Sequence, residues 1–174
     1  MERFSIVVGD ITQSDAEAIV NAANTSLLGG SGVDGAIHKA AGPALLSECR
    51  GLGGCETGKA KLTRGYNLRA RYVLHTPGPV WQGGGLGEPA LLASCYRSCL
   101  TLAAQQGLES VAFCCISTGE FHFPAPEAAQ IAVAAVKEFL QDQTSVRKVI
   151  FNVYKKTDDV LYRSLLGPDR APES

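Results

Sequence analysis

Two segments of the sequence combine glycines with side chains that are able to bind a sugar or a phosphate. The first, VNAANTSLLGGSGVDGAIH, contains two asparagines, an aspartate and a histidine: Asn21, Asn24, Asp34 and His38. The second, ISTGEFHFP, contains hydroxyl groups and aromatic rings. Amides donate to and accept from sugar hydroxyls, and backbone N–H groups at the start of a helix receive phosphate oxygens. Two such loops favour a ligand with two linked phosphates.

Each of these residues also has a structural explanation that needs no ligand. Asparagine often hydrogen-bonds its own backbone in a turn, and Asp34 is suited to cap a helix that we expect to start at Gly35. His38 follows Asp34 by one helical turn on the same face. It is therefore either part of a ligand-facing pair or a satisfied helix histidine. The glycines alone fit a simple turn as well as a phosphate loop.

The glycines Gly30, Gly32 and Gly35 match the GxGxxG pattern of dinucleotide-binding folds. In those folds the first glycine follows the strand directly, so that the pyrophosphate lies on the next helix. Here the residues NAANTSLLG separate the strand from Gly30, and the nearest acidic residue that could hold a ribose, Glu48, comes too early. The pattern therefore does not predict a nicotinamide enzyme.

A second partial motif, GGCETGKA, resembles a P-loop. Gly53, Gly58 and Lys59 have the required spacing, but Ala60 stands where a P-loop needs a hydroxyl to bind magnesium. The preceding residues, SECRGL, also make a poor strand. We therefore do not expect an ATPase.

The elements that must position these loops alternate between apolar strands and amphipathic helices, which is typical of an α/β domain. We expect a three-layer α/β/α domain with a mixed central sheet of about six strands, whose ligand lies beyond the carboxyl ends of the strands. Expected strands cover residues 4–9, 16–23, 110–118 and 146–154, together with a hairpin within 60–81; expected helices cover 35–49, with a break at Gly42-Pro43, and 88–106, 126–141 and 158–167.

Length and composition limit the possible functions. The 174 residues fit one domain, and we expect residues 168–174 to form a disordered tail. Sixteen basic and seventeen acidic residues leave no broad positive field, so we do not expect nucleic acid as a partner. No apolar run suits a signal peptide or a membrane span, so we expect a cytoplasmic protein without a membrane partner.

The chain has six cysteines, and no two of them form a CxxC pair: Cys49, Cys55, Cys95, Cys99, Cys114 and Cys115. This spacing favours buried free thiols over zinc ligands or disulfides. We therefore expect neither a metal nor another cofactor.

Taken together, the motifs closely resemble the macrodomain family, and within it the MacroD-type subgroup found in bacteria. The segments VVGDIT, AIVNAANTSLLGG, GVDGAIHKAAGP, TGKAKLTRGYNL, VLHTPGPVW and ISTG occur in the order and spacing of that family, over essentially residues 4–166. The resemblance implies a single macrodomain over residues 1–167 that binds ADP-ribose. In this subgroup it implies a hydrolase that removes ADP-ribose from acidic protein side chains or deacetylates O-acetyl-ADP-ribose. ADP-ribosylated proteins would be its partners, and we expect a monomer.

The resemblance also implies a role for each site residue. Asp10 and the backbone of Ile11 would bind adenine, with Tyr154 nearby. Asn21, Asn24 and Asp34 would surround the distal ribose, with Phe123 against it. The catalytic set would be Asp34, Asn24, Asn21 and His38, with Asp34 holding a water. The diphosphate would lie between two loops that contain Gly30, Ser31, Gly32 and Val33, and Ser117, Thr118, Gly119, Glu120, Phe121, His122 and Phe123.

Three of these positions depart from the family pattern. Ser31 stands where the family often has glycine, and Glu120 and His122 stand where it commonly has an aliphatic residue and glycine. A carboxylate directed at a diphosphate would repel it, so we expect Glu120 to face solvent or the substrate protein. These departures leave a reader that binds ADP-ribose without hydrolysis as the alternative function. An RNA-associated regulator is a third, which the neutral charge disfavours.

Overall fold

The computed structural model describes residues 3–167. Six strands form one mixed sheet in the order β1-β6-β5-β2-β4-β3. The strands are β1 (Phe4–Val8), β2 (Ala18–Ala23), β3 (Lys61–Arg64), β4 (Tyr72–Pro77), β5 (Ser110–Phe113) and β6 (Lys148–Val153). All neighbouring pairs are parallel except β3 and β4, which form the expected antiparallel hairpin. The prediction of a mixed six-stranded α/β sheet is confirmed.

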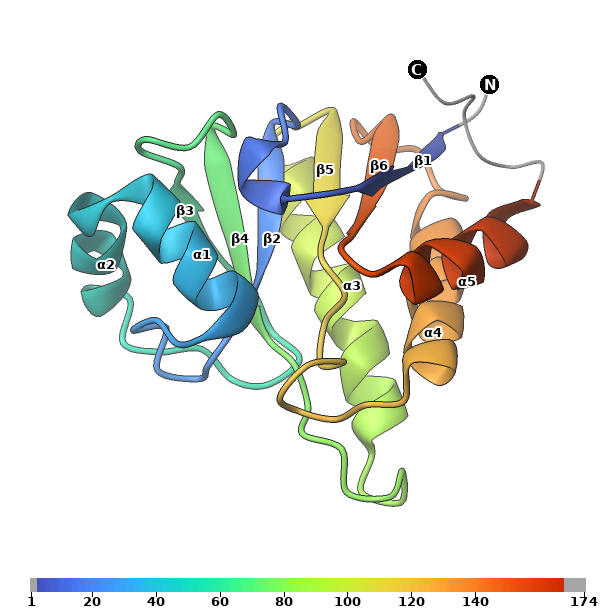
Figure 1. The fold of residues 1–174 in the computed structure, drawn as a ribbon. Helices are drawn as coiled ribbons and strands as arrows, with labels where there is room; N and C mark the ends of the chain where they lie inside the picture. Colours follow the sequence, from blue (N-terminus) through green and yellow to red (C-terminus); the bar gives the residue numbers. More distant parts are fainter. Residues whose placement is uncertain (1–2, 168–174) are drawn as a thin grey trace.

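The helices cover both faces of this sheet (Figure 1). They are α1 (Gly32–Ala41), α2 (Pro43–Arg50), α3 (Glu88–Gln105), α4 (Ala125–Phe139) and α5 (Lys156–Leu166), and a short 3-10 helix, η1, covers Ile11–Gln13. α1 and α2 lie on one face, α3 and α4 pack against each other on the opposite face, and α5 packs beside β1 and β6. The break between α1 and α2 falls at Gly42 and Pro43, as expected, because Gly42 has a φ of 87° and proline suits the first turn of a helix.

The strands that carry the loops of interest are buried on both faces. β2 has the burial expected of a central parallel strand, and the side chains of Ile19, Val20, Val111 and Val149 are fully buried. Parallel strands end at the same edge of a sheet, so the segments after β1, β2, β5 and β6 converge there. Among residues 3–167, no helix is long and apolar enough to span a membrane. The predicted disordered tail, 168–174, lies outside the described residues.

A buried carboxylate organises the glycine-rich loop that precedes α3. Glu88, only 2% exposed, accepts hydrogen bonds from the backbone N–H groups of Gln82, Gly84 and Leu86 at 2.7–2.9 Å. The same loop begins at Trp81, whose backbone N–H donates to the carbonyl of Phe121 at 2.8 Å. Glu88 therefore holds the loop against the start of α3, and Trp81 joins the same loop to the segment that follows β5. The hydrogen bonds from Gln82 and its neighbours lower the pKa of Glu88 to about 2.

We expect Glu88→Gln to destabilise the fold in a pH-dependent way. The pKa of Glu88 is about 2 in the folded chain, against about 4.3 in an unfolded one. The stabilising contribution of Glu88 is therefore complete at pH values above its pKa in the unfolded chain. It is lost as the pH falls through its pKa in the folded chain. Urea unfolding of wild type and variant should differ most near neutral pH and converge towards about pH 2. The exposed Glu138→Gln is the matched control, and a difference that is independent of pH would contradict the assignment.

Candidate functional site

A cavity of about 740 Å³ opens where the carboxyl ends of β1, β2, β5 and β6 converge. This volume is within the range of about 300–1,000 Å³ that is usual for small-molecule sites. Most of the predicted site residues line it: Asp10, Ile11, Asn24, Ser31, Gly32, Val33, Asp34, Ser117, Thr118, Gly119, Glu120, Phe121 and Tyr154. Five predicted residues do not line it: Asn21, Gly30, His38, His122 and Phe123.

The first wall of the cavity is the N-terminal end of α1. The helix begins at Gly32 with Ser31 as its N-cap, so the prediction that Asp34 caps a helix starting at Gly35 is wrong. The Ser31 hydroxyl does not cap the helix, and the first intrahelical hydrogen bond is that of the Gly35 N–H. The N–H groups of Gly32 and Val33 therefore have no partner within the helix, and they lie at its N-terminal end beside the cavity. The helix dipole stabilises an anion at this end.

Two of the glycines in the GxGxxG pattern are required for close packing. A Cβ atom on Gly30 would lie 2.8 Å from Asn24 Nδ2 and 3.0 Å from Asp34 Oδ2. A Cβ atom on Gly35 would lie 2.6 Å from the carbonyl oxygen of Gly30. The loop thus folds back onto the helix and brings Asn24 close to Asp34. This explains the pattern without a dinucleotide fold.

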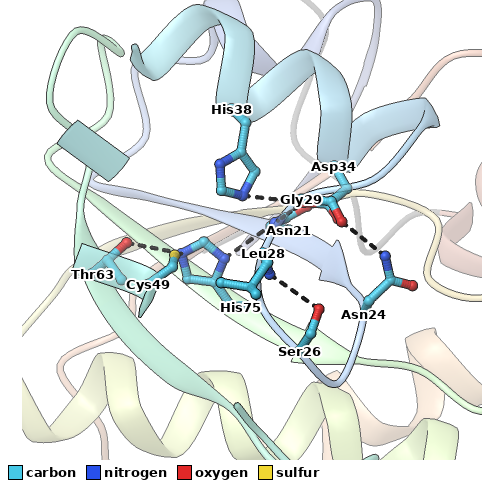
Figure 2. A network of polar contacts seen from close by, with 10 residues as sticks. All are labelled: Asn21, Asn24, Ser26, Leu28, Gly29, Asp34, His38, Cys49, Thr63 and His75. Atoms are coloured by element: carbon cyan, nitrogen blue, oxygen red, sulfur yellow. Dashed lines mark hydrogen bonds and ion pairs between the residues drawn. The ribbon is translucent and has the colours of Figure 1, made fainter. Parts of the chain in front are cut away.

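Asp34 is a buried carboxylate with one occupied and one free oxygen. Its Oδ1 accepts a hydrogen bond from Asn21 Nδ2 at 2.9 Å, and His38 Nε2 lies 3.4 Å from the same atom (Figure 2). Its Oδ2 has no hydrogen-bond partner in the part of the chain that the structure describes, although the residue is only 4% exposed. Burial raises the pKa of Asp34, and the Asn21 hydrogen bond and His38 oppose that increase. The free oxygen is an acceptor beside Asn24 at the cavity.

The four predicted catalytic residues form two layers. Asn24 and Asp34 line the cavity, and Asn24 Nδ2 donates to the Gly29 carbonyl at 3.0 Å. Asn21, predicted to surround the distal ribose together with Asn24 and Asp34, is fully buried within β2 behind Asp34 and does not line the cavity. His38 is in α1, one turn after Asp34. Asn24 reaches the cavity because it follows the end of β2, whereas Asn21 is inside the strand.

The second wall is the loop after β5. Ser117 adopts a left-handed backbone with a φ of 67°, and its buried hydroxyl has no hydrogen-bond partner within residues 3–167. This strained conformation and the unpaired hydroxyl are typical of a ligand-binding loop. Phe123 is only 2% exposed and packs on Trp81, with ring centroids 4.7 Å apart. Phe123 therefore supports this wall from behind, and Phe121 lines the cavity in its place.

The positions that depart from the family pattern lie on both walls. The Ser31 hydroxyl donates to the Glu120 carboxylate, which connects the two loops. Glu120 is exposed, as expected, but its side chain also lines the cavity. His122 adopts a φ of 62°, the left-handed conformation that histidine tolerates better than most residues. Its side chain is exposed and lies outside the cavity lining.

The opposite end of the cavity is formed by residues near β1 and β6. Asp10 Oδ1 accepts from both the N–H and the hydroxyl of Thr12, at 2.9 and 2.7 Å, which fixes the carboxylate. Asn152 Nδ2 donates to the Gly9 carbonyl at 2.9 Å and joins β6 to the segment after β1. Tyr154 is 82% exposed, so its ring is available to a flat ligand.

Several lining residues were missed by the sequence reasoning: Gly9, Ala22, Ala36, Cys114, Cys115, Asn152, Lys155 and Asp158. Most of them are unremarkable strand or helix residues, and only the pairing of β1 with β6 brings Asn152 to the site. Cys114 and Cys115 are free, like the other four cysteines, so the expectation of free thiols is confirmed. Burial raises the pKa of Cys114 to about 12, which leaves it without nucleophilic thiolate at neutral pH.

Comparison with known proteins identifies this arrangement. The Macro domain model matches residues 20–132. The Macro domain-containing protein of Chlorobaculum tepidum is 54% identical over 161 residues, which cover 92% of this chain and 94% of that protein. The ADP-ribose glycohydrolase MACROD2 of Xenopus laevis is 53% identical over 168 residues, which cover 95% of this chain and 40% of that protein.

Solved structures agree with the sequence matches. The Trypanosoma brucei macrodomain in complex with ADP-ribose is 44% identical with a TM-score of 0.90, over 95% of this chain and 69% of that one. A mutant of the Oceanobacillus iheyensis macrodomain with ADPR is 42% identical with a TM-score of 0.89, over 92% of this chain and 90% of that one. The chain belongs to the Macro domain family.

Proposed function

We propose that this chain is a hydrolase that releases ADP-ribose from acidic side chains of mono-ADP-ribosylated proteins and also deacetylates O-acetyl-ADP-ribose. The observation that carries this proposal is the free Oδ2 of the buried Asp34. This oxygen lies near Asn24, in the first turn of α1, where the helix end suits a phosphate. The similarity to a protein named ADP-ribose glycohydrolase supports the reaction type, and the macrodomain structure in complex with ADP-ribose supports the ligand.

In this proposal the ligand extends along the whole cavity. Adenine lies at the end formed by Asp10 and Tyr154, and the diphosphate lies between the N-terminal end of α1 and the loop that begins at Ser117. The distal ribose then reaches Asn24 and Asp34. The N–H groups at the start of α1 and the Ser117 hydroxyl support this direction, since they are donors without a partner among residues 3–167.

The reaction is the hydrolysis of an ester at the distal ribose. A water that donates a hydrogen bond to Asp34 Oδ2 attacks the ester, and Asn24 and the ligand's own phosphate orient that water. The products are a ribose hydroxyl and a free carboxylic acid, so no other reactant is consumed. Asp34 acts as base or as orienting group, a role that typically contributes about 10²–10⁴-fold. The raised pKa of Asp34 brings its basicity closer to that of a general base.

The direct test is release of ADP-ribose from a protein that is mono-ADP-ribosylated on glutamate, with calorimetric ADP-ribose binding measured on the same preparation. A serine-linked conjugate is the comparison substrate. We expect release from the glutamate conjugate only, and release of acetate from O-acetyl-ADP-ribose. Tight binding without any release would make this chain a reader, and failure to bind ADP-ribose would overturn both functions.

We expect Glu120→Gln to tighten ADP-ribose binding by up to about fivefold at low salt. The Glu120 carboxylate lines the cavity and receives the Ser31 hydroxyl, so its charge lies on the wall assigned to the diphosphate. Its exposure limits the repulsion to about 1 kcal/mol, which corresponds to about fivefold in Kd. The control is Glu127→Gln, at an exposed site in α4. Unchanged or weaker binding by Glu120→Gln would contradict this assignment.

A further inference from the structure

A chain of buried polar side chains runs from Asp34 away from the cavity and across neighbouring strands, on the face of the sheet that α1 and α2 cover (Figure 2). Asn21 Nδ2 lies 2.9 Å from Asp34 Oδ1 and 3.1 Å from His75 Nδ1. The other ring nitrogen of His75, Nε2, lies 2.8 Å from the Thr63 hydroxyl. Asn21, His75 and Thr63 are each at most 1% exposed. This network lies outside the cavity, and the mechanism above does not use His75.

Strand pairing brings these residues together. Asn21 in β2 and His75 in β4 are directly paired in the parallel ladder. β3 runs antiparallel to β4, and its Thr63 is two residues from Lys61, the partner of His75. Side chains two residues apart point to the same face of a strand, so Thr63 and His75 meet diagonally. Three neighbouring strands therefore support one carboxylate in α1.

The partners of the network determine where each hydrogen lies. A carboxylate oxygen only accepts hydrogen bonds, so the nitrogen of the Asn21 amide must face Asp34. Its second hydrogen then points to His75 Nδ1, which must be an acceptor. A neutral imidazole with an unprotonated Nδ1 carries its hydrogen on Nε2 and donates it to Thr63. The Thr63 hydroxyl in turn donates to the Arg64 carbonyl at 3.2 Å.

This order requires a neutral imidazole. A second proton would place an N–H of His75 against an N–H of Asn21, and both side chains are fully buried. Burial, with a smaller contribution from the charge of His38, lowers the pKa of His75 to about 3. The ring therefore stays neutral at the pH values where proteins of this kind work.

The orientation of Asn21 matters for the free oxygen of Asp34. With its amide nitrogen held towards Asp34, Asn21 occupies Oδ1 and leaves Oδ2 at the cavity. A reversed amide would place its oxygen against the carboxylate, and Asp34 would turn away from Asn24. The carboxylate disfavours this reversal, and the accepting Nδ1 of His75 opposes it as well, because it takes the second hydrogen of the same amide nitrogen.

We propose that His75 is a positioning residue for hydrolysis: its Nε2–H tautomer, fixed by Thr63, orients the Asn21 amide and through it the carboxylate of Asp34. The inference rests on the proposed function, since it assumes that Asp34 positions the reacting water. His75 touches no ligand. Its loss should therefore reduce kcat, and leave ADP-ribose affinity nearly unchanged.

The test compares two substitutions at the same position. His75→Leu removes the acceptor at similar volume, and we expect kcat to fall by about 10- to 100-fold with Kd changed less than about threefold. His75→Asn places an amide oxygen near the position of Nδ1, so it should recover most of that loss. A merely structural role predicts the opposite order, because His75→Asn also loses the Thr63 contact and leaves a larger cavity. Unfolding temperatures of both variants are measured alongside.

The tautomer itself is measured independently of activity. Long-range proton–nitrogen NMR spectra of the wild type should show His75 neutral and protonated at Nε2, and Thr63→Val should shift it towards the Nδ1–H form. An Nδ1–H tautomer in the wild type overturns the inference, as does wild-type kcat in His75→Leu or equal loss in both substitutions. If the wild type itself releases no ADP-ribose, the proposed function fails. If the wild type releases ADP-ribose and His75→Leu releases it at the same rate, the proposed function stands and only the inference about His75 fails.

Discussion

Asp34→Asn should abolish hydrolysis and preserve ADP-ribose binding. The amide is nearly the same size as the carboxylate, and its oxygen can still accept the hydrogen bond that Asn21 donates at 2.9 Å. What disappears is the free acceptor at Oδ2, the only part of Asp34 that the proposed mechanism assigns to water. Single-turnover release from the glutamate-linked conjugate should fall by about 10³-fold, as for removal of a general base.

Binding and stability should change in the opposite direction to turnover. Removing a buried negative charge relieves both its desolvation, which raises the pKa of Asp34, and its repulsion of a diphosphate. Calorimetry should therefore give an equal or lower Kd, and the unfolding temperature should not decrease. The pH profile of kcat/KM for the wild type reports the pKa of Asp34 in the free enzyme. The midpoint of its acid limb should therefore lie above the ordinary aspartate pKa of about 3.9.

The control for this variant is Asp142→Asn, which neutralises an exposed carboxylate after α4. It should leave turnover, binding and stability unchanged. Wild-type turnover by Asp34→Asn would remove Asp34 from the mechanism. Parallel loss of turnover and binding would instead give Asp34 a role in holding the ligand.

Gly30→Ala should reduce kcat by about 100-fold without unfolding the chain. The added Cβ would lie 2.8 Å from Asn24 Nδ2 and 3.0 Å from Asp34 Oδ2, closer than carbon contacts in proteins allow. One or both polar groups must move, and a displacement of about 1 Å in a catalytic group typically costs about 10²-fold. Gly30 is exposed and is not among the glycines with a positive φ, so alanine introduces no backbone strain.

The matched control is Gly85→Ala, at an exposed glycine without positive φ and with no atom within 4 Å of its added Cβ. Kinetics, unfolding temperature and ADP-ribose affinity are measured on both variants. Wild-type kcat in Gly30→Ala would show that the close approach to Asn24 and Asp34 has no catalytic consequence. Loss of kcat in the control would show that the assay responds to loop glycines in general.

The sequence predicted the elements well because their signals are local. Gly42 and Pro43 mark the break between α1 and α2, and the hairpin of β3 and β4 follows from alternating apolar residues around a turn. The start of α1 was misplaced because Ser31 and Asp34 are both good N-cap types. Asp34 bonds to Asn21 instead of its own helix, and no local pattern predicts that contact.

The second layer of the site could not be predicted, because it depends on which strands are neighbours. His75 is part of an apolar strand segment that indicates only a strand, and its contact with Asn21 requires the register of β2 and β4. Glu88 begins a helix, and its three backbone partners become apparent only once the preceding loop folds around it. Side chains at strand ends are therefore predictable from sequence, whereas the partners that orient them are not.

The pairing of β1 with β6 has a consequence for the order in which the site forms during synthesis. Phe4 pairs with Val149, and Asn152 donates to the Gly9 carbonyl, so the first and last strands meet across almost the whole length of the chain. Contacts so distant in sequence form late, because a long loop must close first. A nascent chain on the ribosome lacks one end of the cavity until β6 emerges, so ligand binding begins only after β6 has been synthesised and has paired with β1.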